Sequence, residues 1–471
     1  KDLPLLNSVI PRDFSSVLVK GRSNYVSLRR LKAAQQRATG LFHSSEEHDQ
    51  LKQIGRWARQ THDGSRSDLT FKPLAAVWDE VASDTGNCLG RKCPSHAQCH
   101  YFAARRRMQN AQLLVVNHAL FFSDLALRRI GVNILPQYDA VIFDEAHTVE
   151  AVAGDHLGLG VTSGQVEWLL AKLYNDRTNK GLLVHHELID LQRQVERCRS
   201  EADELFASLG EWLQRHGGGN GRVRTPEIVP NPLSPALQKL AEGVKDAAAR
   251  MQGESDKQDL NAAAERLLGL GGEIEAWRRQ QIDDGVYWIE SSQSRRGHPR
   301  MRLAAAPIDV GPQLRELLFN EVGSVVMTSA TLSIGKAGSF DFFQSRVGLT
   351  QCDTLKLGSP FDYVRQAKII LPAGMPDPAE SPSEFGKQAA AMIRRYVERT
   401  DGHAFVLLTS YAMMQNLAKQ LGPWLVGRNL ALYSQADGAP RTLMLERFKE
   451  NPRAVLLGTD SFWQGVDVPG A

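Results

Sequence analysis

Short, continuous apolar runs near both ends of this 471-residue chain constrain its fold more than any other feature. Runs of about three to five apolar residues are typical of strands that are buried on both faces of a parallel sheet. Longer helical patterns lie between the runs, for example at 383–398 and 412–421. Because strands alternate with helices, we predict an α/β fold. The runs are Val17–Val19, Leu113–Val116, Ala140–Phe143, Ser324–Met327, Lys368–Leu371, Phe405–Leu408 and Ala454–Leu457.

The middle of the chain has a different pattern. From Ser163 to Arg279, apolar residues recur almost everywhere with helical spacing. A segment rich in glycine and proline, Gly217–Pro235, interrupts this region and predicts a loop between helical hairpins. Sheet-forming sequence resumes near Val286. We therefore predict a helical insertion within an α/β protein.

The overall composition is that of an ordinary globular protein, with 42% hydrophobic and 23% charged residues. A chain of this length suggests roughly three or four domains. The net charge is only +3, so nucleic-acid binding would have to come from local basic clusters. No stretch approaches the roughly 18 apolar residues of a membrane span, and the first residues lack a signal-peptide core. We expect a cytoplasmic, monomeric protein with no membrane partner.

An acidic motif directly follows one of the predicted strands. The strand Ala140–Phe143 ends at Asp144 and Glu145, and His147 lies two residues further on. In open α/β sheets, ligands bind at the carboxyl ends of the strands. There, Asp144 could hold a nucleotide-bound Mg²⁺, Glu145 could orient or deprotonate the water that attacks the γ-phosphate, and His147 could sense that phosphate. The structural alternative is an acidic pair that caps a helix N-terminus.

Two later strands also deliver small or polar residues at their ends. Ser324–Met327 leads to Ser329 and Thr331, whose hydroxyl groups could couple phosphate hydrolysis to domain movement. Ala454–Leu457 leads into a glycine-rich polar loop that would face a nucleotide or a phosphate backbone. Each block alone is also compatible with an ordinary strand–turn–helix connection. The loop residues that we single out are Gln464, Gly465 and Asp467.

Three of the five cysteines lie close together, at Cys88, Cys93 and Cys99. In a cytosolic protein, thiolates at this spacing converge on a metal ion or an iron–sulfur cluster more readily than on disulfides. A zinc site with His96 or His100 as the fourth ligand is an alternative. Three unrelated buried thiols are the structural alternative.

Two stretches, Ser15–Gly40 and Arg91–Met108, carry many basic residues and no acidic residue. Together they would form a positive face that holds phosphates without reading the base sequence. Tyr25, Tyr101 and Phe102 lie among these charges and could stack on bases of single-stranded DNA. A solvated basic helix face with core aromatics is the structural alternative. The basic residues are Lys20, Arg22, Arg29, Arg30, Lys32, Arg37, Arg91, Lys92, Arg105, Arg106 and Arg107.

The order of these blocks resembles that of the superfamily-2 helicases, specifically the DinG/XPD branch and, within it, the bacterial DinG/YoaA-type proteins. The resemblance implies an ATP-dependent DNA helicase that moves 5′ to 3′ in replication-linked repair. It also implies ATP and Mg²⁺ as cofactors and single-stranded DNA and DNA junctions as partners, with single-stranded-DNA-binding or replication proteins as further candidates. The matching blocks are DEAH at 144–147, TSATLS at 328–333, LLTSY at 407–411 and GTDSFWQGVDVPG at 458–470.

Two more blocks, KGRSNY at 20–25 and VVNHALFFSDL at 115–125, are similar to blocks of the same branch. With the basic stretches, they give the DNA-binding residues that we expect. These are Arg22, Asn24, Tyr25, Arg105, Arg106, Arg107, Asn117 and His118.

The resemblance also implies a domain order. Two RecA-like motor domains with parallel sheets are expected, the first interrupted by a small iron–sulfur domain and a helical arch. The expected ranges are 1–20, 111–162 and 286–335 for the first motor domain, 21–110 for the iron–sulfur domain, 163–285 for the arch, and 336–471 for the second motor domain.

The resemblance to this family implies a 4Fe–4S cluster held by four cysteines. The spacing of Cys88, Cys93 and Cys99 is similar to that of the family's last three ligands. The family's first cysteine falls at Ser27, and a serine hydroxyl is a poor ligand for soft iron. We therefore expect a cluster with three cysteine ligands that is completed by Ser27 or water; a labile cluster and the absence of a cluster are the alternatives.

A phosphate-cradling G-x-x-x-x-G-K-S/T loop is not found between Lys1 and Ala471. In the family this loop precedes Lys1, and the final motif follows Ala471. We therefore expect a fragment that is inactive alone, and an intact protein that hydrolyses ATP. Two alternatives stay open: a helicase relative that grips single-stranded DNA without motor activity, and a zinc-stabilised nucleic-acid-binding module.

Overall fold

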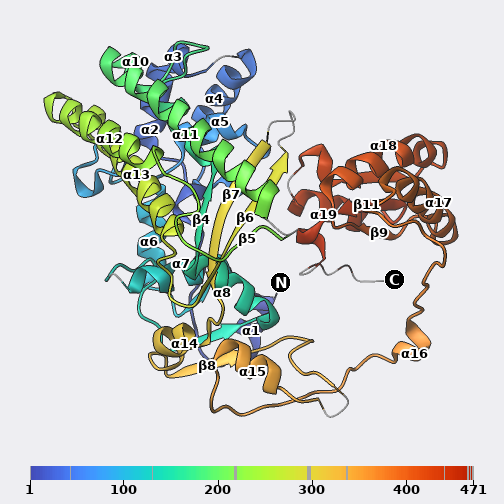
Figure 1. Cartoon of the computed structure of the whole chain (residues 1–471). Coiled ribbons are helices and arrows are strands. Elements are labelled where there is room, and N and C mark those ends of the chain that lie inside the picture. Colours follow the sequence, from blue (N-terminus) through green and yellow to red (C-terminus); the bar gives the residue numbers. More distant parts are fainter. Residues whose placement is uncertain are drawn as a thin grey trace. The chain divides into compact units, whose positions relative to one another are not determined.

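The computed structural model of this chain describes residues 2–42, 44–129, 131–216, 220–293, 299–335, 338–439, 441–463, 466 and 468. Contacts divide the chain into two compact units (Figure 1). The first unit is Lys1–Asp68 with Ala75–Leu357, and the second is Leu69–Leu74 with Gly358–Ala471.

Two pairs of parallel strands lie in the first unit. Strand β1 (Ser16–Leu18) pairs with β2 (Leu113–Val115), and β3 (Ala140–Phe143) pairs with β8 (Ser324–Met327). In the second pair Phe143 lies opposite Met327, so the pairing joins parts of the chain that the helical insertion separates. These strands confirm four of the predicted apolar runs.

Helices pack beside these strands and form their buried core. Phe122 and Leu125 of one helix and Leu314 of another are fully buried together with Phe143 of β3. The helices of the first unit outside the insertion are α1 (Asp2–Val9), α2 (Leu28–Gln36), α3 (Ala38–Leu41), α4 (Ser45–Trp57), α5 (Ala75–Val81), α6 (His100–Gln109), α7 (His118–Arg128), α8 (Val149–Leu157), α14 (Gly311–Leu314) and α15 (Asp341–Val347).

Residues 21–110, which we call the cysteine segment, contain α2 to α6. An isolated β-bridge joins Val26 to Ala82 and holds the start of the segment against the end of α5. Tyr25, Val77 and Trp78 are each at most 3% exposed, so the segment has buried apolar residues of its own.

The predicted helical insertion is present. Its long helices lie beside strands of a second sheet (Figure 1). Cys198, on the longest of them, is 1% exposed within the apolar core of the insertion, and burial raises the pKa of its thiol to about 12. The helices are α9 (Ser163–Leu173), α10 (Leu182–His185), α11 (Ile189–His216), α12 (Leu233–Arg250) and α13 (Glu254–Arg278).

The sheet-forming sequence predicted to resume near Val286 is present as two strands. They form an antiparallel hairpin in a four-stranded sheet of order β4–β7–β6–β5. Tyr287 and Ile289 point into the core of the insertion while Glu290 is exposed, which is the alternation of a half-buried antiparallel strand. Parallel pairing resumes only at Ser324. The strands are β4 (Leu159–Thr162), β5 (Arg222–Val223), β6 (Gly285–Gln293) and β7 (Pro299–Pro307).

The second unit has a parallel sheet of order β10–β11–β9. Its central strand β11 is buried along its whole length, as its continuous apolar sequence predicts. The predicted helical patterns at 383–398 and 412–421 lie within two of its helices. The elements are β9 (Ala404–Leu407), β10 (Ala431–Ser434), β11 (Ala454–Gly458), α16 (Tyr363–Gln366), α17 (Pro382–Thr400), α18 (Tyr411–Gly427) and α19 (Arg441–Glu450).

One predicted strand of this unit is wrong. The run Lys368–Leu371 forms no strand, and Ile369 and Leu371 are 85% and 86% exposed. An apolar run becomes a strand only where a neighbouring strand supplies hydrogen bonds, and none pairs with this run in the described part of the chain. The sequence pattern cannot reveal whether such a neighbour is present.

The α/β fold class with parallel strands is confirmed. Over the residues that the structure describes, none of the helices combines the length and the apolar character needed to span a bilayer.

Candidate functional site

The carboxyl ends of β3 and β8 place the acidic motif beside the serine and threonine motif. The Thr328 backbone N–H donates to the Phe143 carbonyl at 2.8 Å, and the Ala146 N–H donates to the Thr328 carbonyl at 2.9 Å. Between these bonds, Glu145 adopts a left-handed conformation with φ of 50°. This backbone conformation is uncommon for a residue with a side chain and turns the chain sharply at the end of the strand.

Three predicted side chains meet at this turn. His147 Nδ1 lies 2.8 Å from Ser329 Oγ and 3.4 Å from Glu145 Oε2, and the Ser329 hydroxyl lies 3.4 Å from the same carboxylate oxygen. The side chains of His147 and Glu145 are 30% and 44% exposed, so both groups can reach solvent or a ligand. The carboxylate, the imidazole and the hydroxyl therefore form one hydrogen-bonded group across the two strands.

Asp144 and Thr331 lie at the edge of this group. Asp144 is exposed, and its Oδ1 accepts the Glu145 N–H at 3.0 Å. Thr331 is also exposed, and its backbone N–H donates to Ser329 Oγ at 3.4 Å. The other predicted members, Gln464, Gly465 and Asp467, lie outside the residues that the structure describes.

A contact that the sequence does not predict joins this turn to α7 through Thr148 and His118. Thr148 Oγ1 donates to the Glu145 carbonyl at 3.0 Å and lies 3.0 Å from His118 Nδ1. Which of these two atoms donates to the other depends on the tautomer of His118. Burial lowers the pKa of His118, although a backbone hydrogen bond with Asp144 and the Asp144 charge oppose the shift. The sequence predicts that His118 binds DNA; the structure places it beside the acidic motif.

The predicted positive face is smaller than the sequence suggests. Arg30 is buried and donates to the carbonyls of Ala82 and Asp79, and burial lowers its pKa. Arg29 and Arg37 are held by carboxylates of the helical insertion. These three cations of the Ser15–Gly40 stretch therefore satisfy contacts inside the molecule.

Tyr25 is a second correction. Its side chain is 3% exposed and packs edge-on against Tyr101 at 6.0 Å between ring centres. Burial raises the pKa of Tyr25, with Asp63 adding to the shift. Only 3% of Tyr25 is exposed, which is too little surface for a base to stack on, so the predicted stacking does not apply to Tyr25.

Three of the predicted DNA-binding residues, Arg22, Arg105 and Arg107, line a cavity of about 360 Å³. The Arg22 guanidinium lies 4.1 Å from the centre of the Tyr101 ring, and Phe102 lines the same cavity. Arg107 lies 3.4 Å from Asp63, whereas Arg105 donates to the Ile134 carbonyl. The cavity thus combines guanidinium groups with three aromatic rings, those of Tyr25, Tyr101 and Phe102.

The remaining predicted DNA-binding residues are polar or charged. Arg106, on α6, is exposed. The Asn24 amide donates to the Gly21 carbonyl at 3.1 Å, and the exposed Asn117 caps α7 by accepting the Leu120 N–H at 2.8 Å. Each of these two hydrogen bonds joins an asparagine side chain to a backbone group three residues away and so stabilises the local turn.

Comparison with known proteins follows the same division of the chain. Residues 79–166 match the DEAD_2 family and residues 393–471 match the helicase C-terminal domain family. The ATP-dependent DNA helicase YoaA of Escherichia coli is 32% identical over the whole chain, which covers 70% of that protein. The ATP-dependent DNA helicase DinG of Photobacterium profundum is 26% identical, with 72% of it covered.

The chain belongs to the DinG/YoaA family of ATP-dependent DNA helicases. This confirms the resemblance and makes the full protein an enzyme that acts on DNA. Among solved structures, S. tokodaii Xpd4 aligns over 77% of this chain and 68% of its own, with a TM-score of 0.38 and 12% identity.

ATP and Mg²⁺ are expected for such a helicase, and the acidic motif fits the metal in its donor chemistry. A nucleotide-bound Mg²⁺ is usually held by one or two carboxylates together with phosphates and water. Asp144 and Glu145 supply two carboxylates with exposed surface at one strand end. No cluster of three or more potential ligand side chains occurs among the described residues, and a nucleotide-bound ion does not require one.

The cysteines fit an iron–sulfur cluster in chemistry but not in arrangement. Within the described ranges, Cys88, Cys93 and Cys99 are free and are not gathered into a metal-binding group. The Cys88 sulfur accepts the Gly90 N–H at 3.4 Å. Ser27 caps α2 by accepting the Arg30 N–H at 3.4 Å.

The two histidines of the alternative zinc site lie against other side chains. The His96 ring lies 4.8 Å from the Phe102 ring, and His100 packs so closely on Gly64 that a Cβ there would lie 2.1 Å from the ring. Burial lowers the pKa of His100. Among the described residues, neither histidine is gathered with the cysteines into a group that could hold a metal ion.

Proposed function

We propose that the Asp144–Glu145 turn is the ATP-hydrolysis site of this helicase. The observation that carries the proposal is the hydrogen-bonded contact of Glu145, His147 and Ser329 across β3 and β8. It joins a carboxylate that can accept a proton from water to a hydroxyl on a second strand. Hydrolysis at one strand end could therefore be sensed at the other.

Each residue has a definite task in this proposal. Asp144 holds the Mg²⁺ of the nucleotide, and that ion neutralises phosphate charge when it is bound. Glu145 orients the attacking water and accepts its proton. His147, held between Glu145 and Ser329, carries the change in charge to the serine and threonine motif. Gln464, Gly465 and Asp467 stay predicted nucleotide-binding residues, on the resemblance of their motif alone.

DNA binding is proposed for the cavity around Tyr101. Arg22, Arg105, Arg106 and Arg107 hold phosphates near it, and the Tyr101 ring stacks on a base. We further propose 5′ to 3′ movement on single-stranded DNA in replication-linked repair. Asn24 and Asn117 contribute through the backbone turns that they fix.

An iron–sulfur cluster on Cys88, Cys93 and Cys99 remains a prediction from their spacing and from the family resemblance, as do the cytoplasmic location and the monomeric state. No step of the proposed mechanism depends on the cluster. The non-motor and zinc-module alternatives are not favoured, because the relatives are named as ATP-dependent helicases.

The test is the Glu145→Gln variant of the full-length protein. Glutamine keeps the size of the side chain but cannot accept a proton, so DNA-stimulated ATP hydrolysis should fall by about 10²–10⁴-fold while ATP binding is retained. Glu321→Gln, an exposed position before β8, is the matched control and should hydrolyse ATP normally. Near-normal turnover by Glu145→Gln would remove Glu145 from the proposed role.

A further inference from the structure

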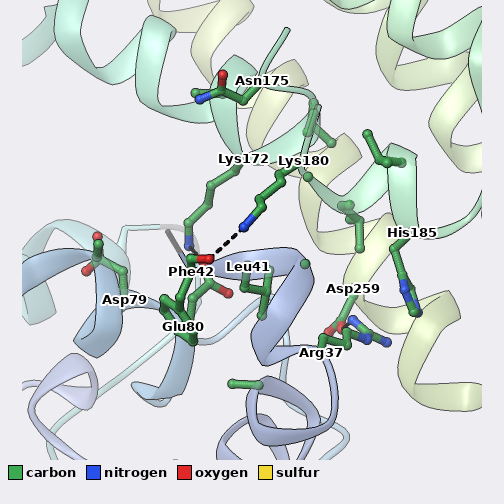
Figure 2. Close-up of a pocket in the computed structure, with 18 of the residues that line it drawn as sticks. Arg37, Leu41, Phe42, Asp79, Glu80, Lys172, Asn175, Lys180, His185 and Asp259 are labelled. Carbon is green, nitrogen blue, oxygen red and sulfur yellow. Dashed lines mark hydrogen bonds and ion pairs between the residues drawn. The ribbon is translucent and has the colours of Figure 1, made fainter. Parts of the chain in front are cut away.

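The cysteine segment and the helical insertion meet at a joint of charged side chains. Arg29 Nη2 lies 3.3 Å from Asp259 Oδ1, and Arg37 Nη1 lies 3.4 Å from Asp259 Oδ2. Arg37 also pairs with Asp256. Both arginines belong to α2 or its C-terminal end, and both aspartates lie near the start of α13. Figure 2 shows Arg37 against Asp259 at the edge of a cavity.

The other contacts that close this joint are also polar. Lys172 pairs with Glu80 at 3.1 Å, and Lys180 Nζ donates to the Phe42 carbonyl at 2.6 Å (Figure 2). A cavity of about 500 Å³ lies between these contacts. The buried core of the insertion contains no residue of the cysteine segment among the residues that the structure describes. The joint also has an apolar contact, because a Cβ at Gly86 would lie 3.2 Å from the Cβ of the buried Ala262 on α13. The ion pairs are the part of the joint that weakens as salt rises.

The two arginines are chemically suited to a different ligand. A guanidinium presents the same planar pair of donors to a carboxylate and to a phosphate. Arg29 and Arg37 lie in the Ser15–Gly40 stretch, which has six basic residues and no acidic one. The carboxylates that pair with these two arginines lie 219 to 230 residues later in the sequence. The carboxylates therefore occupy donors that a nucleic-acid backbone could use.

We propose that Asp256 and Asp259 form an autoinhibitory contact, in which they occupy Arg29 and Arg37 and so exclude DNA phosphates. When the joint opens, the two arginines exchange carboxylates for phosphates and extend the positive surface of the cysteine segment. The proposal rests on the proposed DNA binding by this chain. The proposal goes beyond that function because it assigns two regulated phosphate contacts, by Arg29 and Arg37, to a surface that the closed joint covers.

The size of the effect follows from counterion release. Each single-stranded-DNA phosphate that is neutralised adds about 0.7 to the magnitude of the slope of log K against log salt concentration. Two new contacts add about 1.4 to that slope. At about 0.1 M salt this corresponds to about 25-fold tighter binding, if neither contact forms in the closed state.

The experiment compares two double variants of the full-length protein that change net charge equally. Asp256→Asn with Asp259→Asn removes the carboxylate charges at the joint while keeping side-chain size. Asp203→Asn with Asp246→Asn is the matched control, on positions of α11 and α12 outside the joint. Binding of a fluorescently labelled oligothymidylate is measured over a range of KCl concentrations.

The joint variant should bind more tightly and with the steeper slope, whereas the control should stay close to wild type. Adding Arg29→Gln and Arg37→Gln to the joint variant should abolish the gain. An equal gain in the control, or a gain that persists without the two arginines, would overturn the proposal.

A second readout separates this proposal from the proposed function. Without DNA, the amide hydrogens of α2 should exchange faster in the Asp256→Asn, Asp259→Asn variant than in wild type, because the joint opens more often. Unchanged exchange would show that the carboxylates do not hold the joint. Absence of oligonucleotide binding by every variant, with faster exchange of α2, would instead refute the DNA-binding part of the proposed function and with it the phosphate exchange.

Discussion

The contact between His147 and Ser329 makes a quantitative prediction about coupling. If it transmits the state of the nucleotide from β3 to β8, removing either partner should reduce the DNA unwound per ATP more than it reduces ATP hydrolysis. We therefore consider His147→Ala, Ser329→Ala and the double variant. Ser324→Ala, an exposed serine at the start of β8, is the control.

The magnitude follows from the geometry. The two polar atoms lie 2.8 Å apart, and the His147 side chain is 30% exposed. A partly buried hydrogen bond of this kind contributes about 1 kcal/mol net, which corresponds to about fivefold in a rate or a ratio. The two single variants should each lower the coupling ratio by about this factor. The double variant should be no worse than either, because both remove the same contact.

The assay measures strand separation and ATP hydrolysis in parallel on the same partial duplex. A double-mutant cycle then gives the interaction between the two side chains. Strictly additive losses would show that His147 and Ser329 act independently. An equal loss of hydrolysis and unwinding would place the contact in the chemical step instead of in coupling.

Two further predictions concern acid stability and DNA contact. Hydrogen bonds from Arg278 lower the pKa of Glu275 to about 2 from an ordinary value of 4.5. This pair therefore stabilises the folded state above about pH 4.5 and loses that contribution as the pH falls toward 2. Glu275→Gln should make the thermal-unfolding temperature depend less on pH in this acid range, and an unchanged dependence would contradict the assignment. Tyr101→Ala should weaken oligothymidylate binding by about 1–3 kcal/mol, because a stacking interaction is lost. The salt dependence of binding should change no more than it does in Tyr101→Phe, which keeps the ring. Unchanged affinity of Tyr101→Ala would exclude Tyr101 from the DNA path.

The contact between the acidic motif and the serine and threonine motif is the part that the sequence predicts best. The apolar runs before Asp144 and Ser329 indicate buried parallel strands, and parallel strands bring their carboxyl ends to one edge. The contact of Glu145 with Ser329 follows from that rule. The support that His118 gives through Thr148 does not, because it depends on how α7 packs beside the turn.

The basic face is the part that the sequence predicts worst. Arg29 and Arg37 lie in a stretch without acidic residues, but their partners lie 219 to 230 residues later in α13. Tertiary contacts at that separation leave no local signal. The prediction for Tyr25 is wrong for a related reason, since an aromatic residue among charges can be surface or core and only packing decides which.

The hairpin near Val286 shows its alternation only in the structure. Its sequence from Val286 to Ile289 is a continuous apolar run, whereas in the fold Tyr287 and Ile289 are buried and Glu290 is exposed. Packing against the insertion decides which side chains are buried, and the sequence does not reveal that choice. The cap that Ser27 forms on α2 is a role that the sequence could predict, because serine is among the preferred residues at helix N-termini.

Strand displacement by the full-length protein tests the central claim most directly. The substrates are duplexes with a 5′ or a 3′ single-stranded extension, each with and without ATP, and with the Glu145→Gln variant as the inactive control. The account predicts displacement only with ATP, only from the 5′ extension, and not by the variant. Displacement that needs no ATP, or that Glu145→Gln carries out at the wild-type rate, would contradict it.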